Sequence, residues 1–220
     1  MAYEAADRAK QTAKDNLTDD TLLAIVLAAS AAEGFINDVA GTIQFVSEIP
    51  GRRTDPSFAR ILRISGVLAS LEDDKAQALS RYLCAGILLD LKDFTAGQEP
   101  IQSFRQVLQL RNAVAHPKPV STEANDSLSK TVASLAQRGL CQPIDDSKRN
   151  TMDAETWWVV MRTPAVAFWA VHTVNRVMLS LMDGVVAIGD YKGVLTGWRN
   201  WLRKSLEAGK AAPPEPPPQG

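Results

Sequence analysis

Apolar side chains recur every three or four residues along most of this 220-residue chain, a spacing that gathers them on one side of a helix. Strand signals are nearly absent, because no Asn-Gly or Asp-Gly turn lies between two segments of alternating polarity. Hydrophobic residues make up 45% of the chain, which is enough for a packed core and excludes global disorder. The sequence therefore predicts an all-α protein, a multi-helix bundle.

Helix signals and breakers divide the chain into four parts. We expect an N-terminal extension over 1–17, one helical domain over 18–182, a helical appendage over 183–210 and a disordered proline-rich tail over 211–220. Gly41, the loop around Pro50-Gly51 and Pro117 mark helix ends. The expected helices cover about 19–39, 57–71, 74–92, 100–116, 121–137 and 164–182, with a short basic-aromatic helix at 198–204. The expected apolar stripe of the 74–92 helix is Leu79, Leu83, Ile87 and Leu91, and that of the 164–182 helix is Val166, Ala170, Val174, Val177 and Leu181.

Composition also indicates where the protein is located and which partners it can bind. The two cysteines, Cys84 and Cys141, lack a C-x-x-C partner, so a reduced intracellular compartment follows most simply. No secretory signal precedes Asn16, and the apolar stretch 22–32 is too short to span a bilayer, so we expect a soluble, cytoplasmic protein without membrane contact. The net charge of -1 argues against a dedicated nucleic-acid coat protein, although a local basic patch can still bind a short RNA segment.

The fourth expected helix carries an arginine where an apolar residue is expected. Its apolar positions predict a buried stripe of Ile101, Phe104, Leu108 and Ala115, and Arg111 completes the register. A guanidinium on a core-facing stripe is costly unless a carboxylate or a phosphate meets it. On the first helix Glu33 continues the stripe of Val26, Ala29 and Ile36, so we expect Glu33 to pair with Arg111.

Two further polar residues follow Arg111. Asn112 and His116 are neighbours at i and i+4, whereas Arg111 and His116 lie about 140° apart around an ideal helix. One helix therefore does not gather all three side chains, and a second helix or a second subunit has to complete the site. Spacing alone fits an active site and a purely structural explanation equally well. In the structural explanation Arg111 belongs to a buried ion pair that fixes helix register, and His116 is an ordinary residue at a helix C-terminus.

The stretch Phe104-x-x-Val107-Leu108-x-Leu110-Arg111-Asn112-Ala113-Val114-Ala115-His116-Pro117-Lys118-Pro119 resembles the signature helix of HEPN domains, whose motif is Arg, four to six residues and His, often with Asn after the Arg. Residues 30–37 resemble an early helix of many bacterial members, and 168–171 resemble the Trp-Ala helix downstream of the motif. The resemblance spans roughly residues 22–182.

The resemblance implies an antiparallel helix bundle that forms a homodimer and places two motifs in one cleft. Many HEPN proteins are metal-independent endoribonucleases, and some act as toxins or in phage defence; others are inactive binding modules. The resemblance implies that His116 shuttles protons, that Arg111 clamps the phosphate, and that Asn112 orients His116 or binds the phosphate. Glu33 would then hold Arg111 in place.

Further residues complete the expectations. Lys118, Arg60 and Arg63 are candidate RNA contacts, although arginines of this kind usually form a solvated face. The spacing of His116 and His172 gives no metal site, and without a glycine-rich phosphate loop we expect no cofactor. The expected partners are RNA, a second copy of the chain and a protein antitoxin or regulator. Two alternatives stay open: an inactive helical module that binds a nucleotide, RNA or protein, and a dimeric scaffold tethered through its tail.

Overall fold

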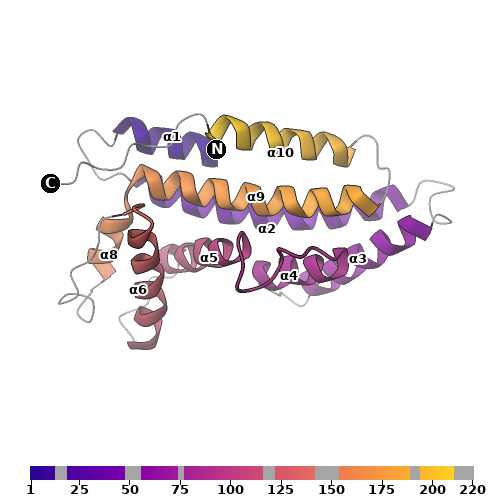
Figure 1. Ribbon diagram of the computed structural model, residues 1–220, viewed down its shortest axis with the longest axis horizontal. Coiled ribbons are helices and arrows are strands. Elements are labelled where there is room, and N and C mark those ends of the chain that lie inside the picture. Colours follow the sequence, from indigo (N-terminus) through magenta and orange to yellow (C-terminus); the bar gives the residue numbers. More distant parts are fainter. Residues whose placement is uncertain are drawn as a thin grey trace. The chain divides into compact units, whose positions relative to one another are not determined.

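The computed structural model describes residues 1–12, 19–47, 56–73, 77–115, 122–141, 154–188 and 194–210. Every regular element in these ranges is a helix, which confirms the predicted all-α class (Figure 1). In chain order the helices are α1 (Ala2–Thr12), α2 (Asp20–Ser47), α3 (Pro56–Asp73), α4 (Ala78–Leu89), α5 (Ile101–Ala115), α6 (Thr122–Gln137), α8 (Ala154–Met161), α9 (Pro164–Ile188) and α10 (Val194–Lys210).

Several helices are longer than the sequence predicts. Helix α2 continues through Gly41 to Ser47, since burial of Ile43 in the added turns offsets the roughly 1 kcal/mol that a mid-helix glycine costs. Helix α9 continues past the predicted end at residue 182 to Ile188, and its Val185 is buried. The predicted N-terminal extension contains α1, and three alanines of α1 are fully buried: Ala5, Ala6 and Ala9.

The chain forms two compact units. Unit 1 comprises 1–29, 106–173 and 209–220, and unit 2 comprises 30–105 and 174–208. Helices α2, α5, α9 and α10 contribute residues to both units. The predicted domain boundaries stay a prediction, and the predicted disordered tail lies outside the described residues.

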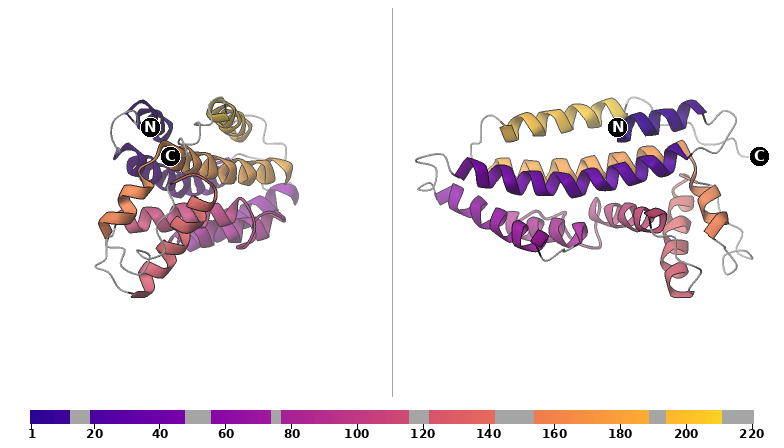
Figure 2. Two further views of the ribbon diagram at one scale, coloured as in Figure 1. Left: turned by 60° about the vertical axis from the view of Figure 1, so that its left-hand side comes forward. Right: turned by 180° about the vertical axis from the view of Figure 1, so that it is seen from behind.

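In unit 1, α6 lies beside α8 and is tied to α5 by side-chain hydrogen bonds (Figure 2). Gln106 on α5 donates to the hydroxyl of Ser134 at 3.2 Å, and the Thr131 hydroxyl on α6 donates to Gln109 at 3.0 Å. Cys141, just after α6, is 5% exposed, and burial raises the pKa of its thiol to about 11. This thiol is therefore protonated at neutral pH and fills space as a small apolar group.

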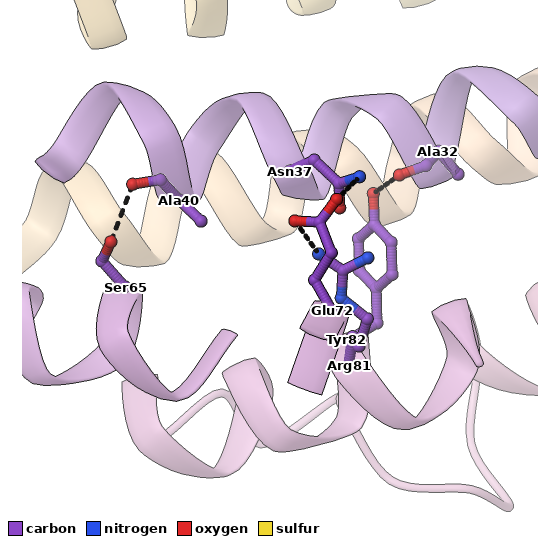
Figure 3. Close-up of polar contacts among 7 residues, drawn as sticks. All are labelled: Ala32, Asn37, Ala40, Ser65, Glu72, Arg81 and Tyr82. Carbon is purple, nitrogen blue, oxygen red and sulfur yellow. Dashed lines mark hydrogen bonds and ion pairs between the residues drawn. The ribbon is translucent and has the colours of Figure 1, made fainter. Parts of the chain in front are cut away.

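In unit 2, α4 buries a different face from the predicted one. The leucine-rich stripe of Leu79, Leu83, Ile87 and Leu91 is wrong as a core stripe, because Ile87 is 78% exposed and the three leucines are only half-buried. The buried residues are Ala78, Arg81, Tyr82, Ala85, Gly86 and Leu89. Small residues on this face let neighbouring chain approach closely. On the same face the Tyr82 hydroxyl donates to the Ala32 carbonyl of α2 at 3.0 Å (Figure 3).

Two glycines within helices of unit 2 give a matched stability prediction. A Cβ on Gly86 would overlap the side chain of Phe94, whereas a Cβ on Gly66 meets nothing within 4 Å. We expect Gly86→Ala to lower the free energy of unfolding by about 1–3 kcal/mol through overpacking. Gly66→Ala should raise it by about 0.5–1 kcal/mol, because alanine loses less entropy in a helix. Urea unfolding of both variants checks this, and equal shifts would contradict the packing around Gly86.

Two helices are long and apolar enough to cross a bilayer by length and composition alone: Asp20–Phe45 of α2 and Pro164–Ala187 of α9. The sequence predicted an apolar stretch of only 22–32, too short to span a bilayer, because Glu33 interrupts the apolar pattern. Glu33 does not interrupt the helix, however, so α2 is longer than this stretch. In α9, 61% of the most apolar window is buried within the chain, as in the core helix of a globular protein. In α2 the exposed Asp38 would be costly against lipid.

Candidate functional site

The predicted motif lies at the C-terminal end of α5, which stops at Ala115, two residues before Pro117. Arg111 and Asn112 belong to the last turns of the helix, so the structure places both of them. His116 and Lys118 lie outside the described residues. The predicted helix end at residue 116, before Pro117, therefore also lies outside the described residues.

Helix α5 buries Ile101, Phe104, Val107 and Leu110 completely. The predicted stripe is thus right at its first two positions, but Leu108 is half-buried and Ala115 is exposed. Arg111 is half-buried and not on a buried stripe as predicted, since the residues that α5 buries end at Leu110. A guanidinium at such an edge avoids the large cost of full burial and stays accessible to solvent. This is the environment in which an arginine can meet an anionic ligand.

Arg111 is held by its neighbour. Its Nη1–H donates to the Oδ1 of Asn112 at 2.9 Å, although adjacent side chains on a helix point about 100° apart. The long arginine side chain bends toward the exposed asparagine to make this bond. Asn112 therefore has a role that the sequence did not suggest: its amide oxygen orients the guanidinium.

The predicted pairing of Glu33 with Arg111 joins residues of different units. Glu33 is half-buried on the part of α2 that belongs to unit 2, whereas Arg111 belongs to unit 1. Both side chains have polar or charged interactions. The pair itself stays a prediction.

The two arginines of α3 are exposed, and one of them has a structural contact. Arg60 Nη2–H donates to the carbonyl of Leu88 at 3.1 Å, in the last turn of α4. A cation at this end of a helix offsets the negative pole of the helix dipole. Arg60 thereby caps α4, which fits the structural alternative better than the RNA-binding one, while the RNA-binding role of Arg63 stays a prediction.

Unit 2 also contains a polar cluster that the sequence reasoning missed (Figure 3). Arg81 on α4 is 5% exposed, and its Nη2 lies 3.5 Å from Oε2 of Glu72 on α3. Asn37 on α2 donates to the other Glu72 oxygen. Among the described residues, Arg81 Nε and Asn37 Oδ1 are buried without a hydrogen-bond partner. The signal that could have found the cluster is the position of Arg81 between Ala78 and Ala85 on the small-residue face of α4.

This cluster is better explained by structure than by catalysis. It joins α2, α3 and α4, and a charge that is buried in one defined place favours one arrangement of these helices over others. In the described part of the chain no group of three metal-ligating side chains comes together. His172 is half-buried on α9 and has an interaction partner within the chain.

The motif at the end of α5 therefore remains the candidate site, with Arg111 and Asn112 as its described members. Comparison of the chain with family models, curated proteins and solved structures finds no match.

Proposed function

We propose that this chain is a metal-independent endoribonuclease of the HEPN type, a toxin or phage-defence effector that works as a homodimer with a composite site. The observation that supports this most is the half-buried Arg111, held by Asn112 at 2.9 Å in the last turns of α5. In the sequence His116 follows Ala115, the last described residue of this helix. A fixed cation, a hydrogen-bonding amide and an imidazole are thereby kept within one short segment.

The proposed chemistry uses the 2′-hydroxyl of the RNA as the nucleophile. His116 of one copy takes the proton from this hydroxyl, and the oxygen attacks the adjacent phosphorus. The bond from phosphorus to the 5′-oxygen then breaks, and the protonated His116 of the second copy gives its proton to the leaving oxygen. Arg111 stabilises the negative charge that develops on the phosphate oxygens, for which its fork of N–H donors is suited. The products are a 2′,3′-cyclic phosphate and a free 5′-hydroxyl.

The test is an RNA cleavage assay in the presence of EDTA, with His116→Ala as the matched variant. We expect the unaltered chain to cleave RNA into cyclic phosphate and 5′-hydroxyl ends, to leave DNA of the same sequence intact, and to lose this activity with His116→Ala. The proposal is wrong if the unaltered chain cleaves no RNA, or if His116→Ala cleaves the same RNA as the unaltered chain. Products with 5′-phosphates would contradict the attack by the 2′-hydroxyl.

A second candidate is an inactive helical module that binds a nucleotide, RNA or protein. The observation in its favour is that Arg111 already has a hydrogen-bond partner within the chain. In that case Arg111→Ala should destabilise the fold, and His116→Ala should change nothing measurable. The cleavage assay and urea unfolding of the two variants separate the candidates.

The cytoplasm is the proposed location, since RNA substrates and a protein antitoxin or regulator would be met there. The burial of α9 and the exposed acid on α2 support a helical core over a membrane anchor. Arg63 and Lys118 are the remaining proposed contacts to the RNA backbone.

A further inference from the structure

Helix α10 packs onto unit 2 through one side and carries a large aromatic ring on the other. Its buried residues are leucines: Leu195, Leu202 and Leu206. Trp198 is half-buried and meets the Phe35 ring of α2, with the ring centroids 6.1 Å apart. Trp201, one turn further along, is 63% exposed. In both Figure 1 and Figure 2 the helix runs alongside α9. Trp201 therefore belongs to the outer side of α10.

Small residues next to Trp201 leave its ring open. Gly197 precedes it by one turn, and a Cβ on Gly197 would meet nothing within 4 Å. Ser205 follows it by one turn, and Ala208 lies on the same line one turn further. Residues four apart are neighbours on a helix surface, so these are the positions from which a bulky side chain would cover the indole. A flat ligand can therefore approach the indole along α10.

The charged residues of this side have both signs. Lys204 is exposed one turn after the tryptophan. Further round the helix, Arg203 is paired with Asp183 of α9 at 3.0 Å. Glu207, the only acid in the sequence of α10, is a surface neighbour of both basic residues. Arg176 of α9 is exposed as well. Lys204 is thus the cation of α10 that shares a side with the indole.

The acids of α2 lie on the other side of the tryptophan. Asp38 is exposed one turn after Phe35, which is the residue that Trp198 contacts. Trp198 and Lys204 are about 120° apart around α10. Glu33 is half-buried and has an interaction partner. The charges of the region nearly cancel, so an anionic ligand would be held by a local contact to Lys204 and not by a strong overall field.

From this arrangement we infer that Trp201 and Lys204 form a binding site for single-stranded RNA. An unpaired base stacks on the indole, and the lysine ammonium binds a phosphate of the same strand. Asn200, exposed one turn before Lys204, donates its amide N–H groups to a base edge or a phosphate oxygen. The site uses residues of unit 2 alone. The choice of RNA over single-stranded DNA rests on the proposed function.

The composition of this side favours a nucleic acid over a lipid surface or a protein. A helix that lies in a membrane interface turns a broad apolar face to the lipid, but the leucines of α10 are buried within the chain. Lysine and glutamate are depleted at the core of protein interfaces, whereas Lys204 and Glu207 are both exposed on this side. Base stacking needs an open aromatic ring with a cation nearby, and this side of α10 has both.

The first experiment measures the fluorescence anisotropy of a labelled single-stranded RNA of mixed sequence. All proteins carry His116→Ala, so that cleavage cannot change the probe. We expect Trp201→Ala to weaken binding about 5–150-fold, the usual effect of losing one stacked base. Trp201→Phe should keep part of the affinity, because a smaller ring still stacks. Phe45→Ala is the matched control, since Phe45 is 69% exposed on α2.

Equal affinities of Trp201→Ala and Phe45→Ala for the single strand overturn the inference. Because Trp201 is exposed, its substitution leaves the core intact, and an unchanged melting temperature verifies this.

Two further measurements test stacking and the phosphate contact separately. A base can stack on Trp201 only when it is unpaired, so the same RNA in a duplex should bind no better than the single strand binds to Trp201→Ala. A duplex that binds as tightly as the single strand contradicts stacking. Lys204→Gln should reduce the slope of log affinity against log salt by about 0.7, the value for one phosphate contact on a single strand. An unchanged slope removes Lys204 from the site.

The outcomes also separate this inference from the proposed function. If the unaltered chain cleaves no RNA but Trp201→Ala loses RNA binding, the proposed activity is wrong and the binding site stands. If the chain cleaves RNA and Trp201→Ala binds it normally, this inference alone is wrong. Sedimentation with phosphatidylserine vesicles that depends on Trp201, without RNA binding, would instead assign this side of α10 to a lipid surface and overturn the inference.

Discussion

Alanine in place of Arg111 is expected to slow RNA cleavage by about 10²–10³-fold, the usual loss when one donor that stabilises transition-state charge is removed. The reason lies in the position of the side chain. Arg111 is half-buried and bonded to Asn112, so its guanidinium is already oriented before RNA binds. The expected result rests on the proposed activity, and single-turnover rates in EDTA measure it.

Two further substitutions on the same helix sharpen this prediction. Arg111→Lys should give an intermediate rate, because lysine keeps the charge but lacks the fork that matches a phosphate. Arg105→Ala should leave the rate unchanged, because Arg105 is exposed on α5 outside the motif. A rate for Arg111→Ala equal to that of Arg105→Ala, with both variants folded, would remove Arg111 from the site. If Arg111→Ala instead unfolds much more easily than the unaltered chain, the result would favour the inactive module.

The second large effect concerns the core of unit 2. Phe104→Ala should lower the free energy of unfolding by about 3–5 kcal/mol, because it removes a large buried side chain and leaves a cavity. The Phe104 ring is fully buried and meets the Tyr82 ring edge-on, with centroids 5.0 Å apart. The substitution thus removes both apolar burial and a favourable ring contact. Urea unfolding, read as a lower midpoint at constant slope, measures the loss.

An exposed phenylalanine provides the control. Phe45 on α2 is 69% exposed, so Phe45→Ala should change stability by no more than about 0.5 kcal/mol. If the two substitutions cost the same, the burial of Phe104 in this fold is wrong. If Phe104→Ala also changes the slope, the unfolded or the native state has changed in compactness.

The sequence alone predicted the features that depend on local periodicity. The all-α class followed from the spacing of apolar residues, and the stripe of α9 is buried throughout: Val166, Ala170, Val174, Val177 and Leu181. Pro117 predicts that the fourth helix ends at residue 116, because the residue before a proline is disfavoured in a helix. Helix α5 is described as far as Ala115, so the exact end stays a prediction. Arg111 and Asn112 could be selected as site candidates from the motif, but the hydrogen bond between them could not be read from spacing.

The tertiary structure decided which of two possible faces α4 buries. On α4 the leucine-rich stripe and the small-residue stripe have the same helical period, so periodicity cannot choose between them. The structure buries the small-residue face, because Gly86 admits the Phe94 side chain and Tyr82 reaches the Ala32 carbonyl. The cluster of Asn37, Glu72 and Arg81 arises in the same way, from three helices that only the packed fold brings together. Periodicity is a property of one helix, whereas burial depends on the shape of its neighbours.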